Sequence, residues 1–303
     1  MSRVTLESPA VVGVFARAGH GKTVDLVRAG PRCLHIVEPG ALAAATTILG
    51  YTPPNIQGLF DIDAVLAIFK KYAVDPQYDG IAIDDLTRLS LRSESAIKQK
   101  ASGWKVWDIF GEKLRLLFDT AREYKKFVLF NGHEREARTT QAGQFIRGGI
   151  DLPMKLTESV SGAVDGMFRV LKFAEEDAPI HPHPFAFYCP AGDTQWAVKT
   201  RLGNPGWSPM NLGEILRSVD YKGGQVLRRA PGLEWQDKAV QVIAERLLAT
   251  DRAPASVKEV LKVARDQMIG GGKAPAAILW TLHDAEDRAR LLAAQQSRLN
   301  VYG

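Results

Sequence analysis

The feature that most constrains the fold is an apolar run that stops at a small-residue loop, in AVVGVFARAGHGKT at residues 10–23. The pattern predicts a buried strand, a phosphate-binding loop and a helix that opens at Thr23. Small residues let backbone N–H groups curl around phosphate oxygens, Lys22 would reach the β- and γ-phosphates, and the Thr23 hydroxyl would bind Mg²⁺. The sequence therefore predicts a nucleoside triphosphate site. The predicted nucleotide-binding residues are Ala18, Gly19, His20, Gly21, Lys22, Thr23, Val24 and Asn131.

One position departs from the usual loop pattern. Ala16 stands where the pattern begins with glycine. A β-carbon there narrows the allowed backbone conformations but does not abolish the loop. The alternative is a chance Gly-rich turn, and the preceding apolar strand favours the phosphate loop.

The composition is that of an ordinary globular protein. The chain has 303 residues, 46% apolar and 24% charged, and its length predicts one large domain with a small appendage. A Gly- and Pro-rich segment that ends at 232, followed by helical patterns, places the large domain at 1–232 and a small helical region at 233–303. No apolar run is long enough for a membrane span, and the N-terminus lacks the apolar region of a signal peptide. Cys33 and Cys189 lie in apolar stretches and are expected to be buried free thiols, so we expect a cytoplasmic location. The net charge of +5 weakly favours a polyanionic partner.

Strand and helix patterns alternate in the first half of the chain. Helical patterns at 64–72 and 106–124 lie among four short apolar runs, which predicts an α/β fold with a mainly parallel sheet. Strand patterns at 168–173, 185–189 and 195–200 are expected to extend this sheet with antiparallel strands. A connector is expected at 203–232, followed by three helices. The four apolar runs are Val11–Phe15, Cys33–Val37, Ile81–Ile83 and Phe127–Phe130.

Polar residues end three of the predicted strands, at the edge where ligands bind in open α/β sheets. Asp84, at the end of its strand, would hold Mg²⁺ opposite Thr23, and the alternative is a solvated acidic turn. Glu38 ends a strand that we expect beside the phosphate-loop strand, where it could polarise the attacking water. Asp85 is the alternative catalytic carboxylate. Asn131 could contact the γ-phosphate and pass its presence to the following loop.

The order of these motifs resembles that of the RecA/RadA superfamily of ATPases, and most closely the short phage-encoded RecA-like recombination proteins. The resemblance covers roughly residues 8–205 and includes WAVKTRLGNP at 196–205, which is similar to a Lys-Asn-Arg-Phe-Gly motif. It implies a RecA-like core that binds ATP and Mg²⁺ between subunits of a ring or filament. It also implies that Lys199 and Arg201 reach the nucleotide of a neighbouring subunit, with Lys22, Glu38 and Asp84 completing the catalytic set.

In that family two loops after the third and fourth core strands face DNA. The corresponding segments here are expected at 88–105 and 135–150, which are basic and rich in hydroxyl and amide groups. Trp104 and Phe145 could stack on bases, although Trp104 could equally start the core of the next helix. The predicted contacts to single-stranded DNA are Arg88, Arg92, Lys98, Lys100, Arg135, Arg138 and Arg147.

The leading expectation is a DNA-dependent ATPase in phage-type recombination, single-strand annealing or repair. The expected partners are single-stranded DNA, further copies of the chain and a single-strand-binding or other recombination protein. A P-loop kinase with an arginine-rich lid remains open. So does an ATP-controlled loader or adaptor without turnover, whose C-terminal helices would hold its partner.

Overall fold

The computed structural model describes residues 4–49, 51–58, 61–153, 156–172, 185–203 and 206–229. The chain divides into two units, formed by residues 1–43 with 53–228 and by 44–52 with 229–303. Nearly all described residues belong to the first unit, and most of helix α2 (Ala43–Leu49) belongs to the second. The boundary expected at 232 stays a prediction, and the helices expected over 233–303 lie outside the described residues.

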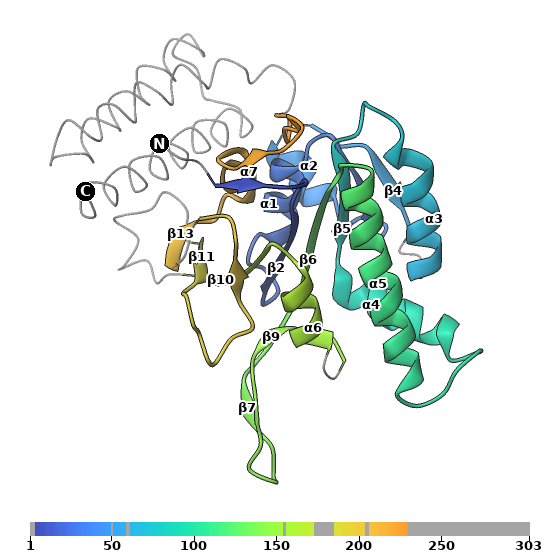
Figure 1. Cartoon of the computed structure of the whole chain (residues 1–303), viewed down its shortest axis with the longest axis vertical. Helices are drawn as coiled ribbons and strands as arrows, with labels where there is room; N and C mark the ends of the chain where they lie inside the picture. Colours follow the sequence, from blue (N-terminus) through green and yellow to red (C-terminus); the bar gives the residue numbers. More distant parts are fainter. Residues whose placement is uncertain are drawn as a thin grey trace, which may run out of the picture. The chain divides into compact units, whose positions relative to one another are not determined.

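A mixed, mostly parallel sheet forms the centre of the first unit, in the order β13-β11-β10-β2-β6-β5-β3-β4 (Figure 1). The pairs from β10 through β2, β6, β5 and β3 to β4 are parallel, and β11 is antiparallel to both β10 and β13. The predicted α/β class with a mainly parallel sheet is confirmed. The strands of this path are β2 (Val11–Ala16), β3 (Cys33–Val37), β4 (Asn55–Gln57), β5 (Gly80–Asp84), β6 (Phe127–Arg135), β10 (Gly166–Lys172), β11 (Phe185–Cys189) and β13 (Gly206–Pro209).

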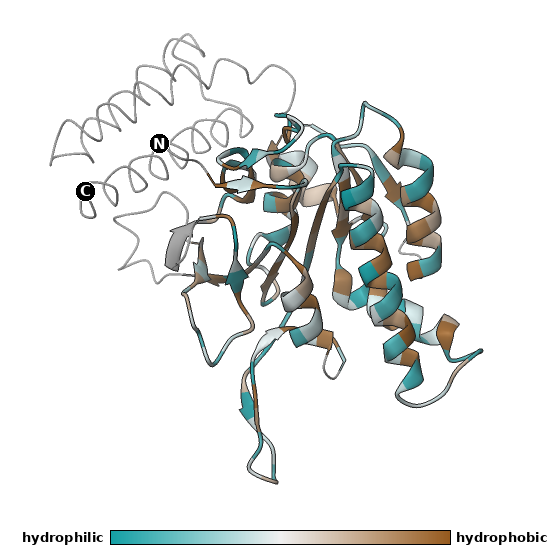
Figure 2. Ribbon diagram, viewed as in Figure 1, coloured by the Kyte–Doolittle hydropathy of each residue, from teal (hydrophilic) through white to brown (hydrophobic). Residues whose placement is uncertain are grey.

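Helices cover both faces of the sheet. One core joins residues such as Phe15 and Phe130 of the sheet to α3, α4, α5 and α6, whereas α1 lies against β2, β5 and β6 beside α7 (Figure 1). Every residue of β2, β3 and β5 is buried, so these strands are hydrophobic on both faces (Figure 2). The helices are α1 (Lys22–Ala29), α3 (Ile62–Ala73), α4 (Leu86–Ile97), α5 (Lys105–Glu123), α6 (Leu156–Ala163) and α7 (Leu212–Arg217).

The remaining short strands lie at the borders of this sheet. Two of them, β1 and β14, pair with each other, and β7 and β8 form a hairpin that projects beyond β9 (Figure 1). Strand β12 pairs with the beginning of β10, and β9 pairs with the end of β6. Their bounds are β1 (Thr5–Leu6), β7 (Arg138–Thr139), β8 (Phe145–Ile146), β9 (Gly149–Ile150), β12 (Lys199–Thr200) and β14 (Asp220–Tyr221).

The structure corrects three expectations about local structure. The segment 88–105, expected as a loop, is mostly helix α4, and only 98–104 connects it to α5. The segment 203–232, expected as a connector, contains α7 and β14. Strand β10 is parallel to β2, because the chain returns through α6 before entering it, and the antiparallel extension begins only at β11. Both cysteines are buried and free, as predicted.

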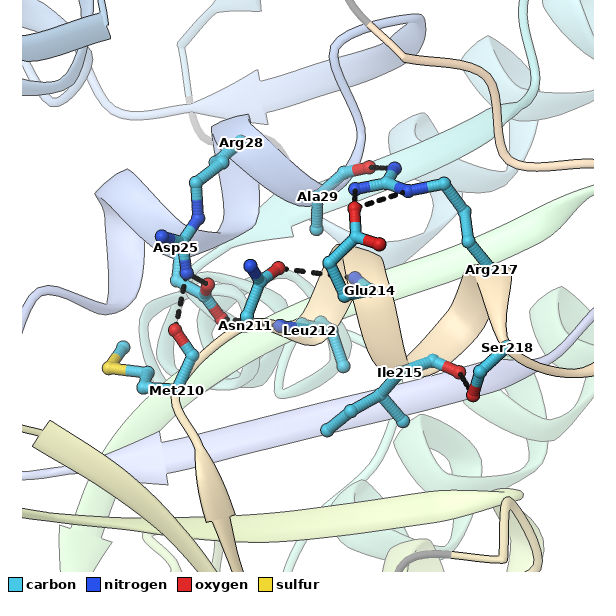
Figure 3. A network of polar contacts seen from close by, with 10 residues as sticks. All are labelled: Asp25, Arg28, Ala29, Met210, Asn211, Leu212, Glu214, Ile215, Arg217 and Ser218. Carbon is cyan, nitrogen blue, oxygen red and sulfur yellow. Dashed lines mark hydrogen bonds and ion pairs between the residues drawn. The ribbon is translucent and has the colours of Figure 1, made fainter. Parts of the chain in front are cut away.

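A buried polar network joins α1 to α7 (Figure 3). Asp25 and Arg28, both on α1, form an ion pair of 2.6 Å, and Arg28 also donates to the carbonyl oxygen of Met210. On α7, the fully buried Glu214 accepts hydrogen bonds of 3.0 and 2.8 Å from Arg217. Each ion pair lies within one helix, and the contacts that join α7 to α1 are the hydrogen bonds from Arg28 to Met210, from the Leu212 N–H to Asp25 and from Arg217 to the Ala29 carbonyl oxygen.

Candidate functional site

The loop that the sequence predicts to bind phosphate spans residues 17–21, connects β2 to α1, and is called the phosphate loop below. Gly19 and Gly21 have φ angles of 78° and 72°, a left-handed region that glycine enters without steric cost. The Lys22 ammonium turns back over the loop and donates to the carbonyl oxygens of Ala16 (3.0 Å) and Arg17 (2.9 Å). The backbone therefore has the curl that the sequence predicts, at the N-terminus of a helix whose dipole favours anions.

The departure at Ala16 has a structural explanation. Ala16 is the last residue of β2 and pairs with His133 of β6, so it has strand geometry. Among the described residues, the only non-glycine with a positive φ is Lys125, which lies far from this loop in the sequence. A β-carbon at position 16 is tolerated because the left-handed turns of the loop fall on Gly19 and Gly21.

Asp84 and Asn131 lie beside the phosphate loop, because β6 runs between β2 and β5. Asp84 ends β5 and is 9% exposed, while Asn131 is fully buried on β6 opposite Val14. The Thr23 hydroxyl and the Asn131 amide both act on the Asp84 carboxylate. Yet Asp84 Oδ2 and both polar atoms of the Asn131 side chain have no hydrogen-bond partner of normal geometry among the described residues. Such buried polar atoms are costly in a folded protein and are characteristic of functional sites.

Burial disfavours the charged forms of Lys22 and Asp84 at this site. It lowers the pKa of Lys22, and the carboxylates of Asp84, Asp85 and Glu134 act against that shift. Burial also raises the pKa of Asp84, although the nearby Thr23 hydroxyl, the Asn131 amide and the charge of Lys22 favour its ionised form. A cation near Asp84 and an anion near Lys22 would therefore both be stabilised.

Glu38 lies beside Asp84 but not beside the phosphate-loop strand. It follows β3, whose Val37 pairs with Asp84, and β5 and β6 separate β3 from β2. The prediction that its strand neighbours β2 is wrong, because chain order does not fix strand order when helices connect parallel strands. The Glu38 side chain is 33% exposed, and its Oε1 lies 3.8 Å from Arg88 Nη1. Its role as catalytic base stays a prediction.

Asp85 has two structural partners. Its side chain caps α4 by accepting a hydrogen bond of 2.6 Å from the Arg88 backbone N–H. Its Oδ2 also lies 3.4 Å from His133 Nε2. The cap gives Asp85 a folding role that is independent of any chemistry.

His20 and the loop residues around it form the outer wall of the site. The His20 ring lies 5.6 Å from that of Phe185, and burial lowers its pKa. Ala18 and Gly19 are exposed, and Val24 is half-buried on α1. The predicted nucleotide-binding residues from Ala18 to Val24 thus lie on the phosphate loop and the first turn of α1, and Asn131 lies on the neighbouring strand β6.

Glu134 ends a strand that the sequence predicts, but neither it nor its partners Arg17 and Arg169 are among the predicted site residues. Glu134 lies near the end of β6 with its side chain 2% exposed, and Arg169 of β10 donates to both of its oxygens at 2.9 and 3.0 Å. Arg17 of the phosphate loop lies 3.8 Å from Glu134 and pairs with Glu136. The Arg169 guanidinium also stacks 3.4 Å above the Trp196 ring. The sequence indicates only that a charged residue follows a buried strand. That Arg169 is its partner becomes apparent only from the strand pairing.

Lys199 and Arg201 are not brought to the phosphate loop of their own chain. Strand β12 pairs with Gly166 and Met167, on the side of β10 away from β2. Lys199 Nζ donates to the Gly162 carbonyl oxygen (2.7 Å), and Arg201 Nη1 lies 3.6 Å from Asp165. Asp165 itself accepts from the first residue of β2, so both cations lie toward the strand end opposite to the loop.

The predicted DNA-binding residues fall into two groups. The Arg135 guanidinium donates to the Leu152 carbonyl oxygen (2.8 Å), and that of Arg147 donates to the Asp193 carbonyl oxygen (2.7 Å), so both contribute to the fold. The other group has exposed side chains on α4, on the connection to α5 and on the β7–β8 hairpin. This second group consists of Arg88, Arg92, Lys98, Lys100 and Arg138. DNA binding by either group stays a prediction.

Neither models of known protein families nor curated protein sequences match this chain. Among the described residues, no group of three or more His, Cys, Asp or Glu side chains could hold a metal ion. No helix in the described part of the chain has the length and apolar character to cross a bilayer. Functional reasoning therefore depends on the geometry of the phosphate loop and its neighbours.

Proposed function

We propose that this protein binds ATP with Mg²⁺ and hydrolyses it, as a RecA-like ATPase whose turnover is coupled to single-stranded DNA. The observation that carries the proposal is the convergence of Lys22 and Thr23 with Asp84 and Asn131 at one edge of the sheet. These residues come from a phosphate loop and two neighbouring strands, and three of their buried polar atoms have no partner of normal geometry in the described chain. A triphosphate with its metal would satisfy such atoms.

The residues present fit this ligand. The loop N–H groups and Lys22 would hold phosphate oxygens, while Thr23 and Asp84 would hold Mg²⁺ directly or through water. Mg²⁺ needs few protein ligands, because phosphate oxygens and water complete its octahedron, and when bound it neutralises developing phosphate charge. Asn131 would donate to the γ-phosphate, and Glu38 would orient the attacking water.

The positions of Lys199 and Arg201 support a site shared between subunits. Both lie toward the end of β2 opposite to the phosphate loop, so within one chain they are directed away from the nucleotide. A head-to-tail assembly could bring them to a neighbour's triphosphate, where cations stabilise transferring phosphoryl groups. A ring or filament of this kind on DNA suits phage-type recombination, single-strand annealing or repair.

The proposal is tested by measuring ATP hydrolysis with and without single-stranded DNA, together with particle size in ATP. We expect hydrolysis without any acceptor, stimulation by DNA, and assemblies larger than one chain. Hydrolysis that requires a small-molecule acceptor would instead indicate a kinase. Tight ATP binding without turnover would indicate a loader or adaptor.

A mixing experiment tests the shared site. Arg201→Ala should retain ATP binding but lose turnover by about 10³-fold, the effect typical of an arginine finger. Mixing Lys22→Ala with Arg201→Ala chains should restore activity at about a quarter of the sites, since random head-to-tail neighbours then combine an intact loop with an intact arginine. Full turnover by Arg201→Ala alone, or no recovery in mixed assemblies that do form, would contradict the assignment.

A further inference from the structure

We propose that a cavity between α5 and α6 binds an arginine side chain presented by a peptide segment of a partner protein. This site is separate from the phosphate loop, and the proposal does not depend on ATP hydrolysis. The cavity has a volume of about 690 Å³, within the usual range for ligand pockets.

Two tryptophans supply the aromatic walls. Trp104, at the N-terminal end of α5, is 66% exposed, and Trp107 is half-buried one turn later. A tryptophan exposed to this degree is unusual on a surface that contacts only water, because it leaves a large apolar face unburied. Indole faces are the aromatic surfaces that bind cations best.

The contact between α5 and α6 at this cavity depends on a glycine in the middle of α5. A β-carbon at Gly111 would lie 2.9 Å from Leu156 Cδ2, so the missing side chain lets α6 approach α5 closely. Glycine in a helix interior costs about 1 kcal/mol relative to alanine. The close approach brings Leu156 and Ser159 of α6 into the lining of the same cavity as the two tryptophans.

The charge of the lining is what selects a cation. Asp108 and Glu112 both line the cavity, four residues apart on one helix face, where like charges disfavour each other. Neither carboxylate has a hydrogen-bond or ion-pair partner among the described residues. Of the lining residues that the structure describes, Arg115 is the one cation, and its Nη2 donates to Ser159 Oγ at 3.0 Å. The described lining thus combines two indoles with two carboxylates and one guanidinium.

These features favour arginine over a nucleic acid. A phosphate backbone at this cavity would meet the Asp108 and Glu112 carboxylates, so the stacking of Trp104 on a DNA base, expected from the sequence alone, is disfavoured. A guanidinium is planar, so it can stack on an indole while it donates two parallel hydrogen bonds to a carboxylate. Lysine would satisfy the charge but lacks that planar fit. Tryptophan and arginine are also the residues most enriched at interface hot spots.

The test uses the full chain labelled with 5-fluorotryptophan and observed by ¹⁹F NMR. The sequence contains six tryptophans, and Trp104→Phe and Trp107→Phe variants assign the two resonances of interest. The probe is acetyl-Gly-Arg-Gly-amide, and its control is the same peptide with neutral citrulline. We expect the Trp104 and Trp107 resonances to shift saturably with the arginine peptide and to remain in place with the citrulline peptide.

Paired variants connect the response to the carboxylates. Asp108→Asn with Glu112→Gln should weaken binding about tenfold or more, a loss of about 1.4 kcal/mol or more. Asp119→Asn with Glu123→Gln changes an exposed carboxylate pair of equal spacing on the same helix, outside the cavity, and should leave the affinity unchanged. Unshifted resonances of the other tryptophans report that each variant is folded.

Three results would overturn the proposal: equal shifts from the citrulline peptide, no shift at saturating arginine peptide, or unchanged affinity in the Asp108→Asn/Glu112→Gln variant. A fourth is displacement of the arginine peptide by an oligothymidine that shifts the same two resonances. That result would assign the cavity to DNA.

Discussion

Helix α1 connects two buried polar clusters that differ in how their atoms are paired. At its N-terminus, Asp84 and Asn131 lie beside Lys22 with polar atoms that lack partners of normal geometry in the described chain. Along its body, Asp25 and Arg28 pair with each other, and Glu214 pairs with Arg217 on α7 (Figure 3). Both clusters are buried, but the carboxylates of Asp25 and Glu214 are paired within the fold, whereas Asp84 Oδ2 is not paired among the described residues.

The difference predicts which substitutions should affect stability and which should affect ligand binding. Charges buried with their partners hold elements together, and removing one partner leaves the other uncompensated. Polar atoms buried without partners cost stability, and they persist where a ligand satisfies them. Substitutions in the α1–α7 network should therefore destabilise the protein, whereas substitutions at the sheet edge should spare or improve its stability while they abolish ligand binding.

The largest stability effect is expected for Glu214→Ala. Its carboxylate is fully buried against Arg217, so the variant leaves a buried guanidinium without its charge partner. We expect a loss of about 3–5 kcal/mol in the free energy of unfolding, measured by urea denaturation. The matched control is Glu94→Ala, which removes a surface pair with Lys98 and should cost less than about 1 kcal/mol. A loss as small as that of the control would remove the basis for the comparison.

A smaller effect of opposite sign is expected for Asp84→Asn. Burial raises the pKa of Asp84 in the folded state, so the native carboxyl group loses stabilisation as pH rises from the ordinary aspartate range through this raised pKa. The neutral amide avoids that loss. Without nucleotide, the variant should gain roughly 0.5–2 kcal/mol at neutral pH and no advantage in strong acid, as followed by thermal unfolding across pH.

Exposed Asp119, which pairs with Arg122 at the surface, provides the control for that experiment. Asp119→Asn should change the unfolding free energy by less than about 0.5 kcal/mol. The comparison fails if Asp84→Asn is less stable than the parent at neutral pH, because its carboxylate would then be satisfied within the fold.

The sequence predicts the elements whose periodicity is clear. Continuous apolar runs locate β2, β3 and β5, and the 3.6-residue pattern locates α3 and α5. Helix α4 was expected as a loop because the family resemblance implies a DNA-facing loop after the third core strand, and its buried side carries the hydroxyl groups of Ser90 and Ser93. Ser93 is satisfied there by accepting from the Ile62 N–H, a contact between two helices that no local pattern reveals.

The candidate site likewise contains parts that local sequence patterns predict and parts that they do not. The loop with Lys22 and Thr23, and the ends of β5 and β6, are readable because each is a short local pattern. Strand order is not readable, which is why Glu38 was expected beside β2. The partners of Arg135, Arg147 and Glu134 come from segments remote in the chain, so their structural roles required the fold.

The most direct test of the central claim is calorimetric titration of Mg²⁺-ATP into the full chain and into Lys22→Ala. The account predicts saturable binding by the parent and binding at least about 100-fold weaker in the variant, a loss of about 2.7 kcal/mol or more. It also predicts that Lys22→Ala unfolds at the same temperature as the parent or higher in the absence of nucleotide. Equal affinity in the two proteins, or no binding by the parent, would contradict the assignment of this sheet edge as a nucleotide site.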